Sequence, residues 1–518
     1  MRVICLSINS VDNLSGVPKW EYSLAFAYIQ AYYTKSSFYE KTEFINLVYY
    51  ENEPIENILN GIQDAKPNIL CFSCYIWNID KVFEVVDVIK ESFVGTKIVL
   101  GGPEFSEQSE EVIEKHPNID IIVIGEGERI LKDVLDCYNA KEEGGLQAIK
   151  GIVYRATEGK GVFTGKRNNI QDLNDIPSPY LLGIVDLSML ENRLVAIETQ
   201  RGCFCDCAYC NYQKGNKKLR FFDCDRVFSE IELILRHKPK QLYLMDPTFN
   251  SNRKRTKEIL ECIKKYNQGT VLNAEMIPDT MDEDIIKLSK AAGMKTVEIG
   301  IQSLNMEAIR IMGRYRNSEK LFNNVNIAIK EGLYLIPQII FGLPGDNFKT
   351  FLDTFEVIYD MPTEELDILI LLLLPQTRYR NDAHKYGIKF KNSTPYQIVE
   401  SESFTKEEIA LLLLFKKLVL VTQPMKLIIR EIKQTLNFSY YKLFLNYLNV
   451  FEEEWKDFDW PIHTKNDKDN AIQTIENFYI YCLNEISGLR NENLRKKLFR
   501  NKRNAQFMLA TRFMRLPN

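Results

Sequence analysis

The sequence lacks the features that mark membrane, secreted and nucleic-acid-binding proteins. Its longest apolar stretches are short or interrupted: Ile368–Leu374 ends at Pro375, and Ile409–Val421 contains Lys416 and Lys417. A bilayer span needs roughly 18 uninterrupted apolar residues, and the apolar run at the N-terminus is too short for a signal peptide. A formal charge of -4 over 518 residues gives no general attraction to nucleic acid. We therefore expect a cytoplasmic protein without a membrane span and without a nucleic-acid partner.

Histidine is also scarce, whereas cysteine is not. The chain has four histidines and eleven cysteines. In a chain without an export signal, thiols serve as metal ligands or core residues, because the cytoplasm is reducing. The scarcity of histidine limits which metal sites the chain can form.

Length and composition indicate a globular protein of several domains. A chain of 518 residues is too long for one ordinary hydrophobic core, and 45% hydrophobic with 26% charged residues is typical of a folded protein. Residues 1–150 alternate apolar runs with amphipathic segments, which predicts a doubly wound (Rossmann-like) α/β domain: a parallel sheet with helices on both faces. The predicted strands are Val3–Leu6, Asn68–Ser73, Lys97–Leu100 and Ile119–Val123.

A second βα series follows a connector. Residues 151–190 are predicted as a linker with a short hairpin, Gly151–Arg155 and Gly161–Thr164. Residues 191–380 contain about six βα units, which fits a partial (β/α)6 barrel of the TIM type with its chemistry at the carboxyl ends of the strands. Residues 381–518 are predicted to be mainly α-helical. The predicted barrel strands are Leu194–Thr199, Gln241–Met245, Val271–Met276, Thr296–Ile301, Leu335–Phe341 and Ile368–Leu374.

Three cysteines follow the first strand of this second series with the spacing C-x3-C-x2-C: Cys203, Cys207 and Cys210. Three thiolates on a short loop can each hold one iron of a cubane cluster, which leaves the fourth iron open to substrate. A closed zinc site would need a fourth Cys or His at a matching distance, and no second C-x2-C pair or histidine pair lies nearby. Cys205, inside the loop, is assigned no ligand role. The spacing therefore predicts a 4Fe–4S cluster.

This loop closely resembles that of the radical S-adenosylmethionine (SAM) superfamily. In that superfamily the open iron binds the amino and carboxylate groups of SAM, and one electron cleaves SAM to methionine and a 5′-deoxyadenosyl radical. The resemblance implies an enzyme that needs an electron donor of the flavodoxin or ferredoxin type. It extends through the barrel, where the implied SAM-binding residues are Tyr209, Asp246, Glu275, Gln302, Arg314 and Gln338.

The SAM positions resemble those of the subfamily that includes oxygen-independent coproporphyrinogen oxidase. The resemblance implies that Glu275 binds the ribose and that Arg314 binds the carboxylate of SAM. Two positions depart from the pattern. Gln338 stands where that relative has an acid, and Met245-Asp246-Pro247 stands where many members have Gly-Gly-Glu. The implied contact of Asp246 is with the SAM amino group.

Residues 1–150 resemble the cobalamin-binding domain that precedes the barrel in one large radical SAM class. The D-x-H-x-x-G motif of cobalamin mutases is absent, and no histidine precedes His116, so the resemblance implies cobalamin without a histidine ligand. The glycine turns would approach its nucleotide tail, and the loop after residue 73 would face the corrin. A domain that has lost the cofactor is the alternative. The implied contacts are Ser73, Tyr75, Trp77, Gly101, Gly102, Pro103, Glu104, Gly125, Glu126 and Gly127.

The segments Leu374–Gly387 and Pro395–Val399 resemble the start of a helical domain of unknown function that is often appended to this class. Together the resemblances imply a cobalamin-dependent radical SAM enzyme that methylates an unactivated carbon of a small-molecule or peptide substrate. Three alternatives remain open. They are a radical rearrangement, cyclisation or epimerisation without methyl transfer, a non-catalytic redox or cobalamin sensor, and a methylthiotransferase-like enzyme.

Overall fold

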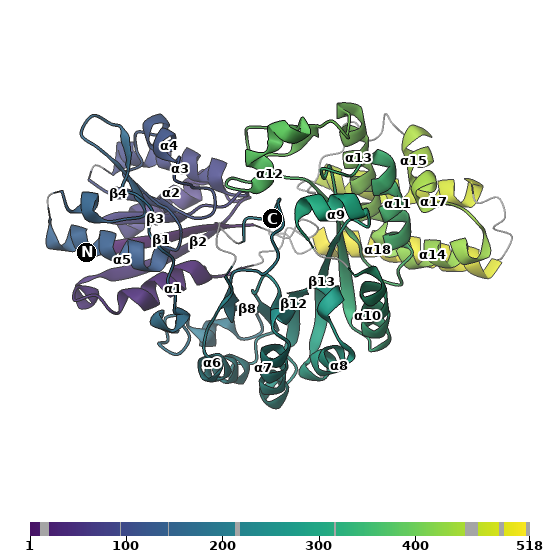
Figure 1. The fold of residues 1–518 in the computed structure, drawn as a ribbon, viewed down its shortest axis with the longest axis horizontal. Helices are drawn as coiled ribbons and strands as arrows, with labels where there is room; N and C mark the ends of the chain where they lie inside the picture. Colours follow the sequence, from purple (N-terminus) through teal and green to yellow (C-terminus); the bar gives the residue numbers. More distant parts are fainter. Residues whose placement is uncertain are drawn as a thin grey trace.

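The computed structural model describes residues 1–518 except residues 11–19, 94, 143, 213–217, 315, 316, 451–464, 486–491 and 514–518. Three regions follow one another along the chain: an N-terminal sheet, a second parallel sheet and a helical C-terminal region. Figure 1 shows them side by side, with the N-terminal sheet at one end of the molecule and the C-terminal helices at the other. This architecture confirms the predicted fold class.

The N-terminal sheet has the strand order β2-β1-β3-β4-β5-β6-β7. Strands β1 to β5 are parallel, and β6 and β7 form an antiparallel hairpin on β5. The hairpin expected in the connector therefore extends this sheet. The strands are β1 (Arg2–Asn9), β2 (Glu43–Tyr50), β3 (Ile69–Ser73), β4 (Lys97–Gly101), β5 (Ile121–Val123), β6 (Ile152–Arg155) and β7 (Gly161–Phe163).

Helices cover both faces of this sheet, because alternate side chains of a strand point to opposite sides. Val3 and Cys5 of β1 pack against α1 and α5, whereas Ile4 and Leu6 pack against α2 and α3. The edge strand β2 is not predicted by the residue pattern, because exposed polar residues interrupt its apolar ones. The helices are α1 (Leu24–Tyr33), α2 (Ile55–Ala65), α3 (Ile79–Ser92), α4 (Glu110–Lys115) and α5 (Gly127–Ala140).

The second sheet is entirely parallel, with the strand order β15-β14-β13-β12-β11-β8. Its strands are β8 (Leu194–Ile197), β11 (Gln241–Leu244), β12 (Val271–Met276), β13 (Met294–Gln302), β14 (Tyr334–Phe341) and β15 (Asp367–Ile370). Its helices are α6 (Cys224–Arg236), α7 (Arg253–Tyr266), α8 (Glu283–Ala292), α9 (Met306–Met312), α10 (Ser318–Lys330) and α11 (Phe348–Tyr359).

The helices of this second sheet pack on one of its sides, as Figure 1 shows for α6, α7, α8 and α10. Side chains that point to the helices, such as Leu242, Ala274 and Val297, are buried. The residues between them along β11, β12 and β13 are mostly half-buried and face the other way. The one-sided covering is that of a partial (β/α) barrel, whose inner face remains available to ligands.

The C-terminal region shares its core with the barrel. Phe355 of α11 packs edge to face against Phe415 of α13 and Phe444 of α15. No helix in the described ranges is both long and apolar enough to cross a membrane. The elements of this region are α12 (Arg378–Asn381), β16 (Lys389–Phe390), β17 (Ile398–Glu400), α13 (Lys406–Thr422), α14 (Lys426–Thr435), α15 (Tyr440–Val450), α17 (Lys465–Glu485) and α18 (Glu492–Phe513).

Candidate active site

The cysteine loop leaves the barrel at the carboxyl end of β8. Strand β9 (Gln200–Arg201) leads into the loop, β10 (Arg220–Phe221) leads out of it, and the two strands pair antiparallel. Gly202 at the entrance has φ +89°, and a Cβ at this position would lie 2.8 Å from the carbonyl oxygen of Lys218. Glycine is therefore required where the two ends of the loop cross.

The three predicted ligands lie close together in this loop. Cys203 is buried, and Cys207 and Cys210 are half-buried. The backbone amide of Cys205 donates to Sγ of Cys203 at 3.4 Å, and the amide of Tyr212 donates to Sγ of Cys210 at 3.5 Å. The thiol of Cys205 lies between those of Cys203 and Cys207 and hydrogen-bonds with both. The loop thus gathers four thiols, of which three have the predicted spacing.

Two of these thiols have a lowered pKa. Hydrogen bonding with Cys205 lowers the pKa of Cys203 to about 6 and that of Cys207 to about 7, against the effect of burial, and Arg314 contributes to both. Burial raises the pKa of Cys210 to about 12. Thiolates are the form of cysteine that binds iron. Within the described ranges, no group of three His, Cys, Asp or Glu side chains is close enough to hold a single metal ion. A 4Fe–4S cluster does not need such a group, because each thiolate binds a different iron. The donor set therefore fits a 4Fe–4S cluster.

Arg314 is fixed beside the cysteines by the end of β13. Its guanidinium donates to Oε1 of Gln302 at 2.6 Å and to the carbonyl oxygen of Gly300 at 2.8 Å. Gln302 has φ +63°, which is rare for a residue with a side chain, and it lies at a bulge between β13 and β14. Nε of Arg314 is buried and has no hydrogen-bond partner among the residues that the structure describes. A free donor on a fixed guanidinium suits a carboxylate such as that of SAM.

Half-buried polar side chains line the inner face of the barrel sheet. Burial raises the pKa of the Cys210 thiol, and the carboxylate of Glu275 of β12 adds to this rise. The amide of Gln338 donates to Oε2 of Glu298 at 3.0 Å, and the hydroxyl of Tyr243 donates to Oε1 at 3.3 Å. Glu298 and Tyr243 are candidate site residues that the motifs do not single out. The only signal for Glu298 is its even spacing from Gln302 on one strand.

Asp246 has protein partners on both carboxylate oxygens. Oδ1 accepts from the backbone amides of Thr199 and Gln200 at 2.7 and 3.1 Å, and Oδ2 accepts from the Thr199 hydroxyl at 2.6 Å. The side chain is buried, and burial raises its pKa to about 7. Asp246 therefore fixes the strand end that leads into the cysteine loop. Its contact with the SAM amino group stays a prediction.

The predicted cobalamin contacts lie in three loops at the carboxyl edge of the N-terminal sheet. They lie, in turn, at the end of β3 and in the loop after it (Ser73, Tyr75 and Trp77), at the end of β4 and in the loop after it (Gly101, Gly102, Pro103 and Glu104), and between β5 and the first residue of α5 (Gly125, Glu126 and Gly127). Buried Asn78 fixes the first loop, because it donates to the carbonyl oxygen of Ser73 at 3.0 Å and accepts from the amide of Tyr75 at 2.7 Å. The rings of Tyr75 and Trp77 stack with centroids 4.4 Å apart, and Trp77 is 45% exposed. This loop thus presents a flat aromatic surface.

The glycines of these turns have different roles. Gly102 has φ +129°, and a Cβ there would lie 2.2 Å from the carbonyl oxygen of Cys74, so the packing of two loops requires glycine. Gly125 has φ +94°, but nothing lies within 4 Å of a Cβ at this position. The open space beside Gly125 leaves room for a ligand to approach the backbone, which fits a cobalamin tail.

Two carboxylates in these turns are hydrogen-bonded to other regions of the chain. Glu104 accepts from the hydroxyl of Tyr396 at 2.7 Å. Glu126 accepts from Arg220 at 3.0 Å and lies 3.5 Å from Arg201. Burial alone would raise the pKa of Glu126, but the two arginines lower it overall. Both acids therefore join the N-terminal domain to the remainder of the protein.

Further contacts bring the carboxyl edges of the two sheets together. Burial raises the pKa of Tyr75, in the loop after β3, and the carboxylate of Glu198, after β8, adds to the rise. Trp20, which precedes α1, packs edge to face on Tyr243 of β11 with ring centroids 5.8 Å apart. The cysteine loop and the Tyr75–Trp77 loop therefore lie on neighbouring edges.

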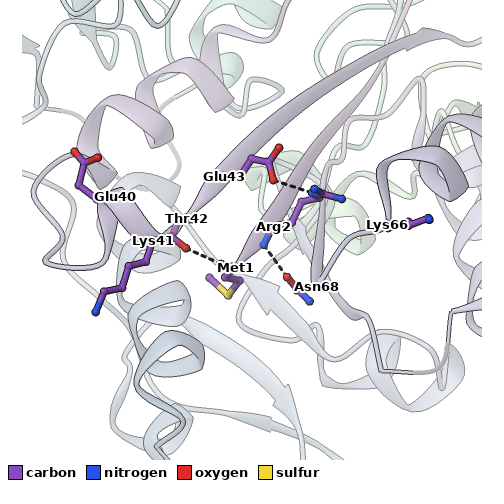
Figure 2. Close-up of a pocket in the computed structure, with 8 residues that line it drawn as sticks. All are labelled: Met1, Arg2, Glu40, Lys41, Thr42, Glu43, Lys66 and Asn68. Atoms are coloured by element: carbon purple, nitrogen blue, oxygen red, sulfur yellow. Dashed lines mark hydrogen bonds and ion pairs between the residues drawn. The ribbon is translucent and has the colours of Figure 1, made fainter.

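A hollow of about 560 Å³ lies at the opposite edge of the N-terminal sheet (Figure 2). Polar groups around it pair with one another: Arg2 Nε lies 2.8 Å from Glu43, and the Arg2 amide donates to Asn68 at 2.7 Å. The hollow is at the amino ends of β1 and β2, away from the cysteines. It is not part of the candidate active site.

Two family models match the chain. The radical SAM superfamily model matches residues 197–358, and the B12 binding domain model matches residues 18–135. The chain therefore carries a B12-binding domain ahead of a radical SAM domain. The matches confirm the predicted family and its cofactors, a 4Fe–4S cluster, SAM and cobalamin.

The relatives compared below share about a quarter of their aligned residues with this chain. TokK, a cobalamin-dependent radical SAM methyltransferase of Streptomyces tokunonensis, is 25% identical over 65% of this chain and 51% of its own length. An anaerobic magnesium-protoporphyrin IX monomethyl ester cyclase of Rubrivivax gelatinosus is 25% identical over 59% of this chain and 56% of its own length. The match thus spans about half the length of each relative. The solved structure of OxsB, a cobalamin-dependent SAM radical enzyme with aqua-cobalamin and SAM bound, has the same fold (TM-score 0.66, 16% identity, 98% of this chain and 83% of OxsB).

Proposed function

We propose that this protein is a cobalamin-dependent radical SAM methyltransferase that acts on an unactivated carbon of a small-molecule or peptide substrate. The observation that carries the proposal is the contact between the carboxyl edges of the two sheets. Glu126, after β5, accepts from Arg220 at the base of the cysteine loop at 3.0 Å, and Trp20 packs on Tyr243 of β11 with ring centroids 5.8 Å apart. The similarity to TokK supports methylation. The proposal assigns residues 1–150 to cobalamin binding, 151–190 to a connector, 191–380 to the barrel and 381–518 to a helical domain.

In this proposal the barrel binds the cluster and SAM. Cys203, Cys207 and Cys210 hold the cluster, which when bound supplies the electron that cleaves the carbon–sulfur bond of SAM. Arg314 binds the SAM carboxylate, because its guanidinium is fixed by Gln302 and matches the planar geometry of a carboxylate. Glu275, beside Cys210, orients the ribose hydroxyls by accepting their hydrogen bonds.

The remaining predicted SAM contacts support this arrangement. Tyr209 hydrogen-bonds with Cys207, and the charge of Arg314 acts on its hydroxyl, so the proposal places its ring beside the cluster. Gln338 is held by Glu298 on the inner face of the barrel and reaches the same space from the next strand. Asp246 acts through the backbone by holding the end of β8.

The N-terminal edge binds cobalamin, which when bound supplies the methyl group. The space beside Gly125 accepts the nucleotide tail, and the stacked rings of Tyr75 and Trp77 cover the corrin. Aromatic surfaces at this place exclude water from the space between the two sheets, and exclusion of water protects reactive intermediates. Glu104 and Glu126 contribute by joining the two domains.

Reduction of the cluster requires an electron donor, for which a flavodoxin or a ferredoxin is suitable. All eleven cysteines are free thiols, which suits the reducing cytoplasm.

The test is product analysis after anaerobic reconstitution with iron, sulfide and hydroxocobalamin, followed by SAM and dithionite. Methyl transfer leaves S-adenosylhomocysteine, and radical cleavage leaves 5′-deoxyadenosine. We expect both products with cobalamin and only 5′-deoxyadenosine without it. S-adenosylhomocysteine that never exceeds the cobalamin-free background would contradict methyl transfer, and the absence of both products would contradict a radical SAM reaction.

A radical rearrangement or cyclisation without methyl transfer is the second candidate. The similarity to the cyclase favours it, because that relative matches the chain with the same 25% identity as TokK. In this case 5′-deoxyadenosine forms with and without cobalamin, and S-adenosylhomocysteine does not form.

A further inference from the structure

Two arginines stand at the base of the cysteine loop. Arg201 lies on the strand that enters the loop, Arg220 lies on the strand that leaves it, and the two residues are paired across the β9–β10 ribbon. Both side chains reach the N-terminal domain. Arg201 donates to Oε1 of Glu128 at 2.6 Å, and Arg220 donates to Oε2 of Glu126 at 3.0 Å. The base of the loop is therefore attached to the turn that follows β5.

Arg201 is surrounded by carboxylates. Its Nε donates to Oε2 of Glu198 at 3.0 Å, and a further nitrogen lies 3.5 Å from Glu126. The guanidinium also lies over the ring of Tyr28, 5.4 Å from its centroid. The side chain of Arg201 is 13% exposed and that of Glu128 is 7% exposed, so water screens their attraction only weakly. One buried cation thus connects the segment after β8, the cysteine loop and the N-terminal domain.

Glu128 makes a single strong contact in this group. Its Oε1 binds Arg201, whereas its Oε2 is buried without a hydrogen-bond partner in the described part of the chain. Burying a carboxylate that is only partly hydrogen-bonded destabilises a fold. Glu128 therefore contributes a negative charge, and it fixes the position of Arg201. Arg201 lies two residues before Cys203.

We propose that Glu128 is a positioning residue for the cluster. Through Arg201 it fixes the direction in which the backbone enters the cysteine loop, and it sets the charge beside the cluster. The inference rests on the proposed function only in requiring that the loop holds a 4Fe–4S cluster. It makes the N-terminal domain part of the cluster environment, although that domain supplies no ligand.

The test is Glu128→Gln in the full-length, reconstituted protein. The amide keeps the shape of the side chain and removes its charge, and Arg201 keeps Glu198 and Glu126, so no buried cation is left unpaired. We expect an iron content like that of the wild type, a reduction potential shifted upward in an EPR-monitored titration, and an altered EPR line shape. The potential rises because reduction adds negative charge, which a nearby carboxylate opposes.

The matched control is Glu21→Gln. Glu21 also forms an ion pair between the N-terminal domain and the barrel, with Arg193, which precedes β8 and lies outside the cysteine loop. We expect this variant to have the potential and line shape of the wild type. Values for Glu128→Gln that equal those of Glu21→Gln and of the wild type would overturn the proposal.

A second variant decides the question if Glu128→Gln fails to load iron. Glu128→Asp keeps the charge but shortens the side chain by one methylene, so we expect a wild-type potential with an altered line shape. A wild-type line shape would overturn the positioning role. These readouts need neither methyl transfer nor cobalamin, so their failure is distinct from failure of the proposed function. A wild-type protein that assembles no cluster would contradict both.

Discussion

The two parallel sheets contain similar βα units, but their faces differ. In the N-terminal sheet, β1, β3, β4 and β5 are buried on both faces, because helices cover each side. In the barrel sheet, helices cover one side, and β11, β12 and β15 alternate buried with half-buried residues. The first sheet can therefore meet a ligand only at its edge, whereas the second offers an edge and an inner face.

This difference explains where polar residues are found. The inner face of the barrel carries Asn273, Glu275, Glu298, Gln338 and Asp367. The central strands β1, β3, β4 and β5 are mainly apolar, with Ser7 and Ser73 as buried polar residues towards their carboxyl ends, and further polar residues lie in the loops beyond those ends. We therefore expect a large cofactor to rest on the edge of the first sheet and SAM to enter the second.

The largest effect is expected from the cysteines. Cys203→Ala, Cys207→Ala or Cys210→Ala removes one of three cluster ligands, so iron content and SAM cleavage should fall to background, whereas hydroxocobalamin binding should persist because it depends on the other sheet. Iron analysis measures the cluster content, and visible absorbance measures the bound hydroxocobalamin. Cys205→Ala is the control and should retain the cluster. Loss of cobalamin binding in the ligand variants would show that the two edges are not separate sites.

A pair of identical substitutions tests the contrast between the faces. Ile98 of β4 is fully buried, whereas Ile336 of β14 is half-buried on the inner face of the barrel. We expect Ile98→Thr to lower the free energy of unfolding by about 3 kcal/mol and Ile336→Thr by about 1 kcal/mol, because only the first hydroxyl is buried among apolar groups. Thermal unfolding of the two variants measures the difference. Equal losses of unfolding free energy in the two variants would contradict the difference between the two sheets.

Substitution of Arg314 tests whether this residue binds the SAM carboxylate in the barrel. Arg314→Lys keeps the positive charge but replaces the guanidinium with a single ammonium. The ammonium cannot bind Gln302 and Gly300 and also donate to a carboxylate in the same geometry. SAM should therefore bind roughly tenfold more weakly. Equilibrium binding of SAM to the reconstituted protein measures this change. Arg310→Lys, at an exposed ion pair with Glu307, should leave the affinity unchanged. An unchanged affinity in Arg314→Lys would remove the residue from the site.

The smallest effect concerns the joint between the sheets and its dependence on pH. Arg220 and Arg201 hold the pKa of Glu126 below its usual value despite burial. A carboxyl group with a lowered folded-state pKa stabilises the fold above its unfolded pKa, and that stability is lost as pH falls through the folded pKa. As the pH is lowered from about 6 through the folded-state pKa of Glu126, the unfolding temperature of the wild type should therefore fall more than that of Glu126→Gln. Parallel curves would contradict the ion pairing.

Local patterns account for what the sequence predicts correctly. The alternation of apolar runs predicts the core strands of both sheets, and the C-x3-C-x2-C spacing predicts the cluster family, because both signals lie within short stretches of chain. The edge strand β2 has no such signal. Its side chains are only half-buried or exposed, so its residues are not uniformly apolar.

Contacts between distant residues are not predicted. Glu104 and Tyr396 are 292 residues apart, Glu126 and Arg220 are 94 apart, and Asp246 and Thr199 are 47 apart. Such pairs are brought together by tertiary packing and leave no periodic trace in the sequence. The candidate residues could thus be named from motifs, whereas the partners that hold them, and the roles of Glu128 and Glu298, required the structure.

The central claim is that two cofactor sites lie on neighbouring edges of two different sheets. Its most direct test is metal analysis of the wild-type protein after anaerobic reconstitution with iron, sulfide and hydroxocobalamin, desalting, and visible spectroscopy before and after SAM is added. We predict about four irons and about one cobalt per chain, with a spectrum that changes when SAM binds. Retention of iron with complete loss of cobalt on desalting would contradict the claim.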